Sequence, residues 1–169
     1  AGVEFATTLV IAVKPQNLDA LLPLLGARLT SEHLVLSIAA GKRLAYYEAA
    51  WPKARIVRVM PNVACFAGEA MSVYTGGQQV RPGDREIIES LLGCFGRYCS
   101  LPESHFDAVT ALSGSGPAFI AYLAEAFTQA AVAEGLPADA ARLLTAQTLL
   151  GTARLLLDNH YASPRELMD

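Results

Sequence analysis

The pattern of this sequence changes near residue 102, and that change limits the folds that the chain can adopt. Before it, short apolar runs typical of strands alternate with segments of helical spacing; the runs span residues 8–13, 33–40, 54–60, 70–77 and 97–101. Such alternation predicts crossover connections and a parallel sheet covered by helices. After residue 102 the strand pattern stops and only helical patterns follow.

Helices are expected between the strands and throughout the second half. Apolar residues recur at helical spacing in the segments 17–29, 42–51, 82–96, 104–112, 117–134 and 138–159. We expect Asn17 to cap the first helix and Pro23 to kink or delay it. Gly135 fits the position after a long helix, and Ser163 with Pro164 fits the start of another.

The sequence therefore predicts an α/β half, residues 1–102, followed by an all-helical half, residues 103–169. The first strand, at residues 8–13, is expected to be buried in the parallel sheet. The two long helices are rich in alanine, glycine and threonine, and small residues allow helices to approach closely. The helical half is too small to bury all of the apolar surface of these two helices by itself. We therefore expect this half to mediate dimerisation.

Composition argues against several classes of function. The chain has 169 residues, 53% hydrophobic and 17% charged, which suits a packed protein rather than a disordered one. The net charge of −3, without a basic cluster, gives no reason to expect a nucleic-acid partner. No apolar run matches a bilayer span and no signal peptide is visible, so we expect no membrane partner.

The cysteines indicate a reducing compartment. Cys65, Cys94 and Cys99 are odd in number and irregularly spaced, which argues against a disulfide framework. Reduced thiols are typical of cytoplasmic proteins. Because no histidine forms a ligand motif with a cysteine, no metal site is expected.

A run of very small residues, Ser113 to Gly116, precedes Pro117 and a long apolar segment. Pro117 fits the first position of a helix, and Ser115 could cap its N–H groups. Neither G-x-G-x-x-G nor G-x-x-x-x-G-K-[ST] is present, so a phosphate loop is disfavoured. Two interpretations stay open. One is a tight corner where Gly114 and Gly116 permit close helix packing; the other is a helix N-terminus facing a ligand.

Three strand ends form the other candidate site. The sequences "AVKPQ" (12–16), "SIAAG" (37–41) and "VMPN" (59–62) each follow or close an expected strand with small, proline or amide residues. Ligands of open α/β sheets bind outside the carboxyl ends of the strands. Each segment alone is also explained by packing or by a turn, and the three together favour a ligand site.

These motifs carry a resemblance to a known family. "IAVKPQ", "SIAAGK", "RVMPNVACFAGEAM", "DAVTALSGSGPAFIAYLAEA" and "GLPADAARLLTAQTLLGTARLLL" occur in the order found in pyrroline-5-carboxylate reductases and span nearly the whole chain. The resemblance implies a Rossmann-type domain over residues 1–102 and a helical dimerisation domain over residues 103–169. It also implies reduction of 1-pyrroline-5-carboxylate to L-proline with hydride from NADPH or NADH.

The resemblance also implies roles for particular residues. The residues it places at the cofactor are Ala12, Val13, Lys14, Pro15, Ile38, Ala39, Ala40 and Asn62. Asn62 and the small-residue run would border the nicotinamide and the substrate, with Thr110, Ser113 and Ser115 as substrate-proximal hydroxyls. No catalytic residue is assigned, because the cofactor carries the hydride and a hydroxyl or water can supply the proton.

Two motifs of the family are not found in the chain. The Gly-rich turn that holds the cofactor pyrophosphate is expected before residue 1, and a substrate-carboxylate loop is expected after residue 169. We therefore expect both the Rossmann-type and the helical domain to be incomplete in these residues. Two alternatives to the proline-forming reaction remain: a related imine or β-hydroxyacid reductase, and a non-catalytic dimeric homologue.

Overall fold

The computed structural model describes residues 2–158 and 163–168. It divides into two compact units, Ala1–Pro117 and Ala118–Asp169. The first unit contains the sheet and the second contains helices. The domain boundary near residue 102 is a prediction from the change of sequence pattern.

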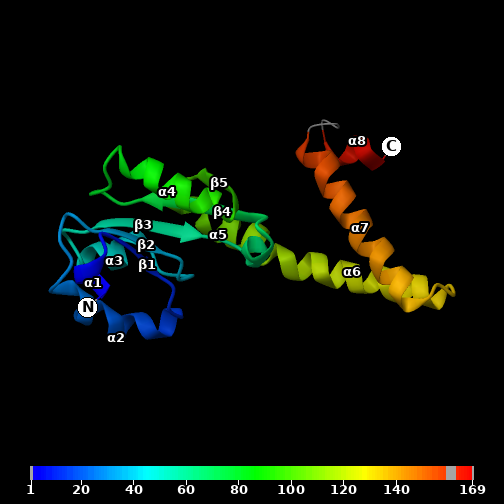
Figure 1. Cartoon of the computed structure of the whole chain (residues 1–169), viewed down its shortest axis with the longest axis horizontal. Helices are drawn as coiled ribbons and strands as arrows, with labels where there is room; N and C mark the ends of the chain where they lie inside the picture. The colour runs from blue at the N-terminus through cyan, green and yellow to red at the C-terminus, as the bar shows by residue number, and fades with distance from the viewer. Residues whose placement is uncertain (1, 159–162, 169) are drawn as a thin grey trace. The chain divides into compact units, whose positions relative to one another are not determined.

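The first unit is built on a five-stranded sheet in which the strands follow one another in chain order (Figure 1). The strands are β1 (Thr8–Ile11), β2 (Leu34–Ser37), β3 (Arg55–Met60), β4 (Ala70–Gly76) and β5 (Gly96–Ser100). The pairs β1–β2, β2–β3 and β4–β5 are parallel, whereas β3–β4 is antiparallel. The predicted α/β architecture with a mainly parallel sheet is therefore confirmed.

The antiparallel β3–β4 pair is the one exception to the predicted parallel pairing in the described sheet. Only residues 61–69 join the two strands, and they include the 3-10 turn Val63–Ala67. A parallel neighbour requires a crossover of about a dozen residues or more, so this short link returns the chain antiparallel. Met60 consequently pairs with Val73 near the end of β3.

Helices cover both faces of the sheet (Figure 1). The short α1 (Gly2–Phe5) lies with α2 (Leu18–Gly26) and α3 (Leu44–Ala50) on one face, and α4 (Asp84–Gly93) lies on the other. Each face of the sheet has its own hydrophobic core, and the side chains of β2 alternate between the two. Val35 packs with Tyr47 and Trp51, while Leu34 and Leu36 pack with α4 residues. All four residues of β2 are therefore buried.

The expectations for the start of the chain need correction. The first strand was expected to be buried, but in β1 only Ile11 is buried and Val10 is 50% exposed. The reason is that β1 is the edge strand of the sheet in the described residues. Asn17 forms no side-chain cap, because the 3-10 turn Pro15–Asn17 gives its backbone a helical conformation. Pro23 lies inside α2.

After β5 the described residues form helices and turns but no strand. A 3-10 turn, Glu103–His105, leads into α5 (Phe106–Val109), a π-helical turn (Thr110–Gly114) and α6 (Gly116–Ala133). The buried Phe106 and Val109 pack against Val73 of β4, so α5 belongs to the core of the sheet unit.

The second unit continues α6 and adds α7 (Ala138–Leu157) and α8 (Pro164–Met168). Gly135 has a φ of 97° and ends α6 as predicted, with bonds from its N–H to Val132 O and from Leu136 N–H to Ala131 O. Ser163 Oγ accepts the N–H of Glu166 at 3.3 Å, which confirms the predicted cap with Pro164 as the first helical residue. Asn159, the expected end of α7, lies outside the described residues.

Large apolar side chains of this unit remain exposed in the single chain. The most exposed on α6 and α7 are Tyr122 (81%), Leu143 (70%), Phe119 (66%), Leu144 (55%) and Ile120 (53%). Contact between the two helices includes a 3.3 Å hydrogen bond from Thr128 Oγ1 to Thr145 Oγ1. No helix among residues 2–158 and 163–168 is long and apolar enough to cross a membrane.

Candidate functional site

The structure places the three predicted strand-end segments at one edge of the sheet. Strands β1, β2 and β3 are parallel neighbours, with Ile11 opposite Ser37 and Ser37 opposite Arg58. Because parallel strands end at the same edge, the chain leaves the sheet there three times in succession. The predicted cofactor residues follow these ends directly: Ala12, Val13, Lys14 and Pro15 after β1, Ile38, Ala39 and Ala40 after β2, and Asn62 after β3.

These residues offer a small and largely accessible surface. Ala12, Lys14, Ile38 and Ala40 are exposed, and Val13, Pro15 and Asn62 are half-buried. Ala39 differs, because its side chain is 4% exposed and packs into the core beside α3. Ala39 therefore presents only its backbone to a ligand, whereas the methyl groups of Ala12 and Ala40 permit a flat ring to approach closely.

The three hydroxyls predicted to be near the substrate differ in their hydrogen bonding. Thr110 Oγ1 donates to Phe106 O at 2.7 Å, and Ser113 Oγ donates to Val109 O at 3.2 Å. The Ser115 side chain is exposed, and its hydroxyl forms no hydrogen bond within the described part of the chain. Ser115 is therefore the one of the three whose hydroxyl proton is not already donated to the backbone.

The small-residue run does not form the capped helix N-terminus that was one of its two interpretations. The N–H of Ser115 donates to Thr110 O at 2.8 Å, closing a π-helical turn that runs directly into α6. Ser115 therefore does not cap α6, which begins at Gly116 with Pro117 second. Single π-helical turns inside helices are frequent at functional sites.

The two glycines of this run differ in their surroundings. A Cβ added to Gly114 would lie 2.6 Å from Cε of Met60, the last residue of β3. A Cβ added to Gly116 would meet no atom of the described chain within 4 Å. Close packing within the chain thus accounts for Gly114 but not for Gly116.

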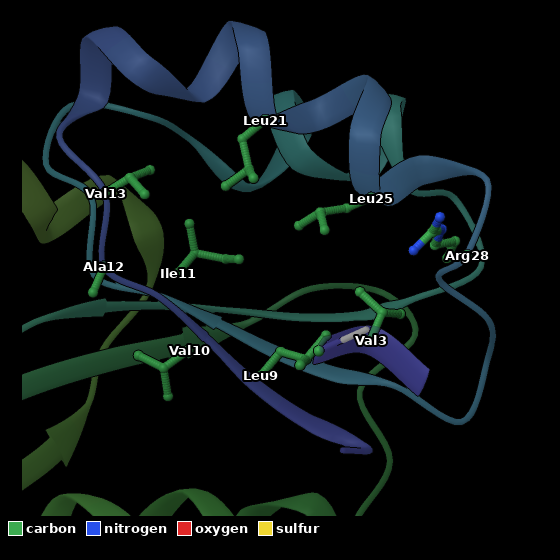
Figure 2. A pocket seen from close by; sticks show the side chains of 10 residues that line it. Val3, Leu9, Val10, Ile11, Ala12, Val13, Leu21, Leu25 and Arg28 are labelled. Atoms are coloured by element: carbon green, nitrogen blue, oxygen red, sulfur yellow. The ribbon is translucent and has the colours of Figure 1, made fainter. Parts of the chain in front are cut away.

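An apolar pocket lies beside the edge strand β1 and adjoins the strand-end surface, because Ala12 and Val13 belong to both (Figure 2). It has a volume of about 300 Å³ and is lined by Ile11, Leu21 and Leu25, whose side chains point toward one another between β1 and α2. Its one charged residue, Arg28, lies at one end and forms an ion pair with Glu4 at 3.7 Å. With a single paired charge, this pocket does not suit a polar substrate.

Metal binding has no structural support in the described residues. No group of three or more His, Cys, Asp or Glu side chains among residues 2–158 and 163–168 could hold an ion.

Comparison with known proteins identifies relatives over nearly the whole chain. A pyrroline-5-carboxylate reductase from Methanosarcina acetivorans is 45% identical over 162 residues, which cover 95% of this chain and 60% of the relative. A family model described as pyrroline-5-carboxylate reductase dimerisation matches residues 103–169. The chain belongs to the pyrroline-5-carboxylate reductase family.

Solved structures of pyrroline-5-carboxylate reductases share the fold. The enzyme from Coxiella burnetii has a TM-score of 0.86 at 34% identity, covering 93% of this chain and 59% of that one. The NADP-bound Plasmodium falciparum pyrroline carboxylate reductase has a TM-score of 0.90 at 27% identity, covering 98% and 63%. The chain thus spans about 60% of the length of these relatives. The Rossmann-type fold that the sequence motifs implied is confirmed.

Two polar contacts behind the strand ends of this pyrroline-5-carboxylate reductase family member were not predicted. Ser37 Oγ donates to the Tyr47 hydroxyl at 2.6 Å and accepts the N–H of Ala39 at 3.3 Å. Burial raises the pKa of Tyr47, which is fully enclosed. Together these bonds fix the turn that carries Ala39 and Ala40.

The second contact is an ion pair between a buried arginine and a half-buried glutamate. Arg58, which is 5% exposed, lies 2.9 Å from Oε1 of Glu103 and 4.5 Å from the centre of the Phe106 ring. The same Glu103 oxygen accepts the N–H of Leu44 at 2.7 Å, so β3, α3 and the turn before α5 are joined. The sequence contains one signal for this ion pair, because Arg58 lies within an apolar strand and a buried arginine requires a partner.

Proposed function

We propose that this chain forms the larger part of an enzyme that reduces 1-pyrroline-5-carboxylate to L-proline with hydride from NADPH or NADH. The observation that carries the proposal is 45% identity to a pyrroline-5-carboxylate reductase over 95% of the chain. We further propose that the protein is cytoplasmic and forms a homodimer or a larger homo-oligomer. The name of the matching family model and the exposed apolar side chains of α6 and α7 support the assembly.

We propose the strand-end surface as the cofactor site. Its eight residues are Ala12, Val13, Lys14, Pro15, Ile38, Ala39, Ala40 and Asn62. The observed chemistry fits a dinucleotide, because exposed alanine methyl groups accept a flat ring and the exposed Lys14 supplies a cation for a phosphate. NADP bound to the P. falciparum structure supports the same cofactor class.

The residues of this chain would then orient the substrate and supply a proton. The cofactor supplies a hydride to the carbon of the cyclic C=N bond. The ring nitrogen must carry or receive one proton, and the Ser115 hydroxyl is our candidate donor because it is exposed and not bonded to the backbone. Thr110 and Ser113 remain candidates for substrate contact through their hydroxyl lone pairs.

The test of this function is NADPH oxidation by the full-length protein in the presence of 1-pyrroline-5-carboxylate, with L-proline identified as the product. Turnover of other cyclic imines with none of this substrate would favour a related imine reductase. Binding of NADPH without turnover of any imine would favour a non-catalytic homologue.

Lys14 provides a first prediction for the cofactor site. Lys14→Ala should weaken NADPH binding by about 1 kcal/mol, or about fivefold in Kd, as for one exposed charge-assisted hydrogen bond. The measurement is calorimetric titration of the full-length protein with NADPH. The matched control is Lys53→Ala, because Lys53 is exposed just before β3, at the opposite edge of the sheet. A thousandfold loss of turnover with unchanged NADPH affinity would instead identify Lys14 as a catalytic acid.

A further inference from the structure

The carboxamide of Asn62 joins three segments that are far apart in the sequence. Asn62 follows the end of β3 with an extended backbone. Its Oδ1 accepts the N–H of Met71 in β4 at 3.3 Å, and its Nδ2 donates to the carbonyl of Ser113 at 3.1 Å. The orientation of the amide follows from its partners, since an N–H must meet oxygen and a carbonyl must meet the NH₂ group.

The Ser113 carbonyl needs this donor because of Pro117. In an α-helix the carbonyl of residue 113 would accept the N–H of residue 117. Proline has no N–H, so that bond cannot form. The half-buried Ser113 is left with a carbonyl that requires another partner, and the Asn62 side chain supplies it.

A second contact fixes the same turn against the end of β3. Gly114 lies so close to Met60 that a Cβ at this position would be 2.6 Å from Cε of Met60. Met60 and Asn62 therefore hold neighbouring residues of the π-helical turn, one by packing and one by a hydrogen bond. The turn carries the hydroxyls of Thr110 and Ser113 and ends at the exposed Ser115.

We propose that Asn62 is a positioning residue that replaces the hydrogen bond absent at Pro117 and thereby fixes the π-helical turn beside the carboxyl end of β3. Within the proposed cofactor surface, Asn62 then borders the cofactor without binding it through the carboxamide, because both ends of the carboxamide are bonded to the backbone. Its effect on catalysis rests on the proposed function. Its effect on the backbone of the turn does not.

The kinetic test compares Asn62→Ala in two backgrounds of the full-length protein. Asn62→Ala should lower kcat by about 10- to 100-fold, as for a misplaced catalytic segment, and leave the Kd for NADPH within about twofold. Pro117→Ala restores an N–H for the Ser113 carbonyl. In that background, Asn62→Ala should cost less than about threefold in kcat, because the carbonyl has a partner of its own. A loss of equal size in both backgrounds overturns the proposal.

Two further variants separate positioning from other effects. Asn62→Asp retains the acceptor for Met71 but places a carboxylate oxygen against the Ser113 carbonyl, so it should lower kcat at least as much as Asn62→Ala. Gln79→Ala, which removes an amide from the exposed turn after β4, should leave kcat unchanged. A tenfold or larger rise in the Kd for NADPH on Asn62→Ala, with kcat retained, would assign Asn62 to the cofactor instead.

Amide hydrogen exchange tests the backbone role without any activity. Peptides covering residues 110–118 should exchange at least about tenfold faster in Asn62→Ala than in the parent protein, and Pro117→Ala should reverse most of that increase. If the parent protein shows no reductase activity, this measurement still decides the proposal. Unchanged exchange in Asn62→Ala overturns it, whatever becomes of the proposed function.

Discussion

Gly96 occupies the position at which this fold can least accept a side chain. Its φ of 143° is strained for other residues, and a Cβ there would lie 2.3 Å from the Ala70 carbonyl oxygen and 2.4 Å from the Ala70 nitrogen. Both clashes are with backbone, so no rotamer change relieves them. Gly96→Ala should lower the free energy of unfolding by about 3 kcal/mol or more, measured by urea denaturation. Gly83→Ala, where a Cβ meets no atom within 4 Å, should change it by less than about 1 kcal/mol.

Tyr74 predicts how stability depends on alkaline pH. It is 5% exposed on β4, and its hydroxyl donates to Oε1 of Glu89 at 2.6 Å. Burial first, and then this bond to a carboxylate, raise the pKa of Tyr74 from 10.0 to about 12. A raised pKa means that the stabilisation is complete below the unfolded value and is lost as pH rises through the folded value.

The free energy of unfolding of the parent protein should therefore fall relative to that of Tyr74→Phe between pH 10 and about 12. Urea denaturation of both proteins at a series of pH values measures the difference. The pKa of Tyr46 is also raised to about 12 by its hydrogen bond to Asp19. Because Tyr46 is present in both proteins, its ionisation does not affect the difference between their free energies of unfolding. Parallel stability curves for the two proteins would show that Tyr74 ionises with the same pKa in the folded and unfolded states.

At the scale of elements, periodicity in the sequence predicts the kind and order of most helices and strands. The buried run Leu34–Ser37 and the helix end at Gly135 follow from local patterns that no other part of the chain overrides. Strand direction is different, because a strand has the same side-chain alternation whichever way it runs. The antiparallel β4 could be inferred only from the short link of residues 61–69.

The candidate site shows the same division between local and long-range information. That Lys14, Ala40 and Asn62 follow parallel strands, and so share one edge, was predictable from the strand pattern. The bond from Asn62 to Ser113 was not, because it spans 51 residues and depends on a carbonyl that Pro117 leaves without a donor. The sequence places Asn62 and Ser113 in two separate motifs. Only the structure shows that the Asn62 side chain donates a hydrogen bond to the Ser113 carbonyl.

For the whole molecule, the main unexplained feature of the single chain is its exposed apolar surface on α6 and α7. Leu143 and Leu144 are 70% and 55% exposed, and α6 has no buried residue in the single chain. Exposed apolar patches of this extent on a folded chain mark interaction surfaces. A second copy of the chain is the partner that the family model for dimerisation supports, since that model covers residues 103–169.

The full-length protein should therefore sediment as a dimer or a larger oligomer at micromolar concentration, with an interface of more than about 2,000 Å² in total. Leu143→Glu combined with Leu144→Glu should shift it toward the monomer, because two carboxylates would have to be buried without partners. Leu24→Glu is the matched control, since Leu24 is 69% exposed on α2 of the sheet unit and should not affect assembly. Analytical ultracentrifugation of the three proteins provides the comparison. A parent protein that stays monomeric at these concentrations would contradict the proposed assembly and leave the apolar surface of α6 and α7 to another partner.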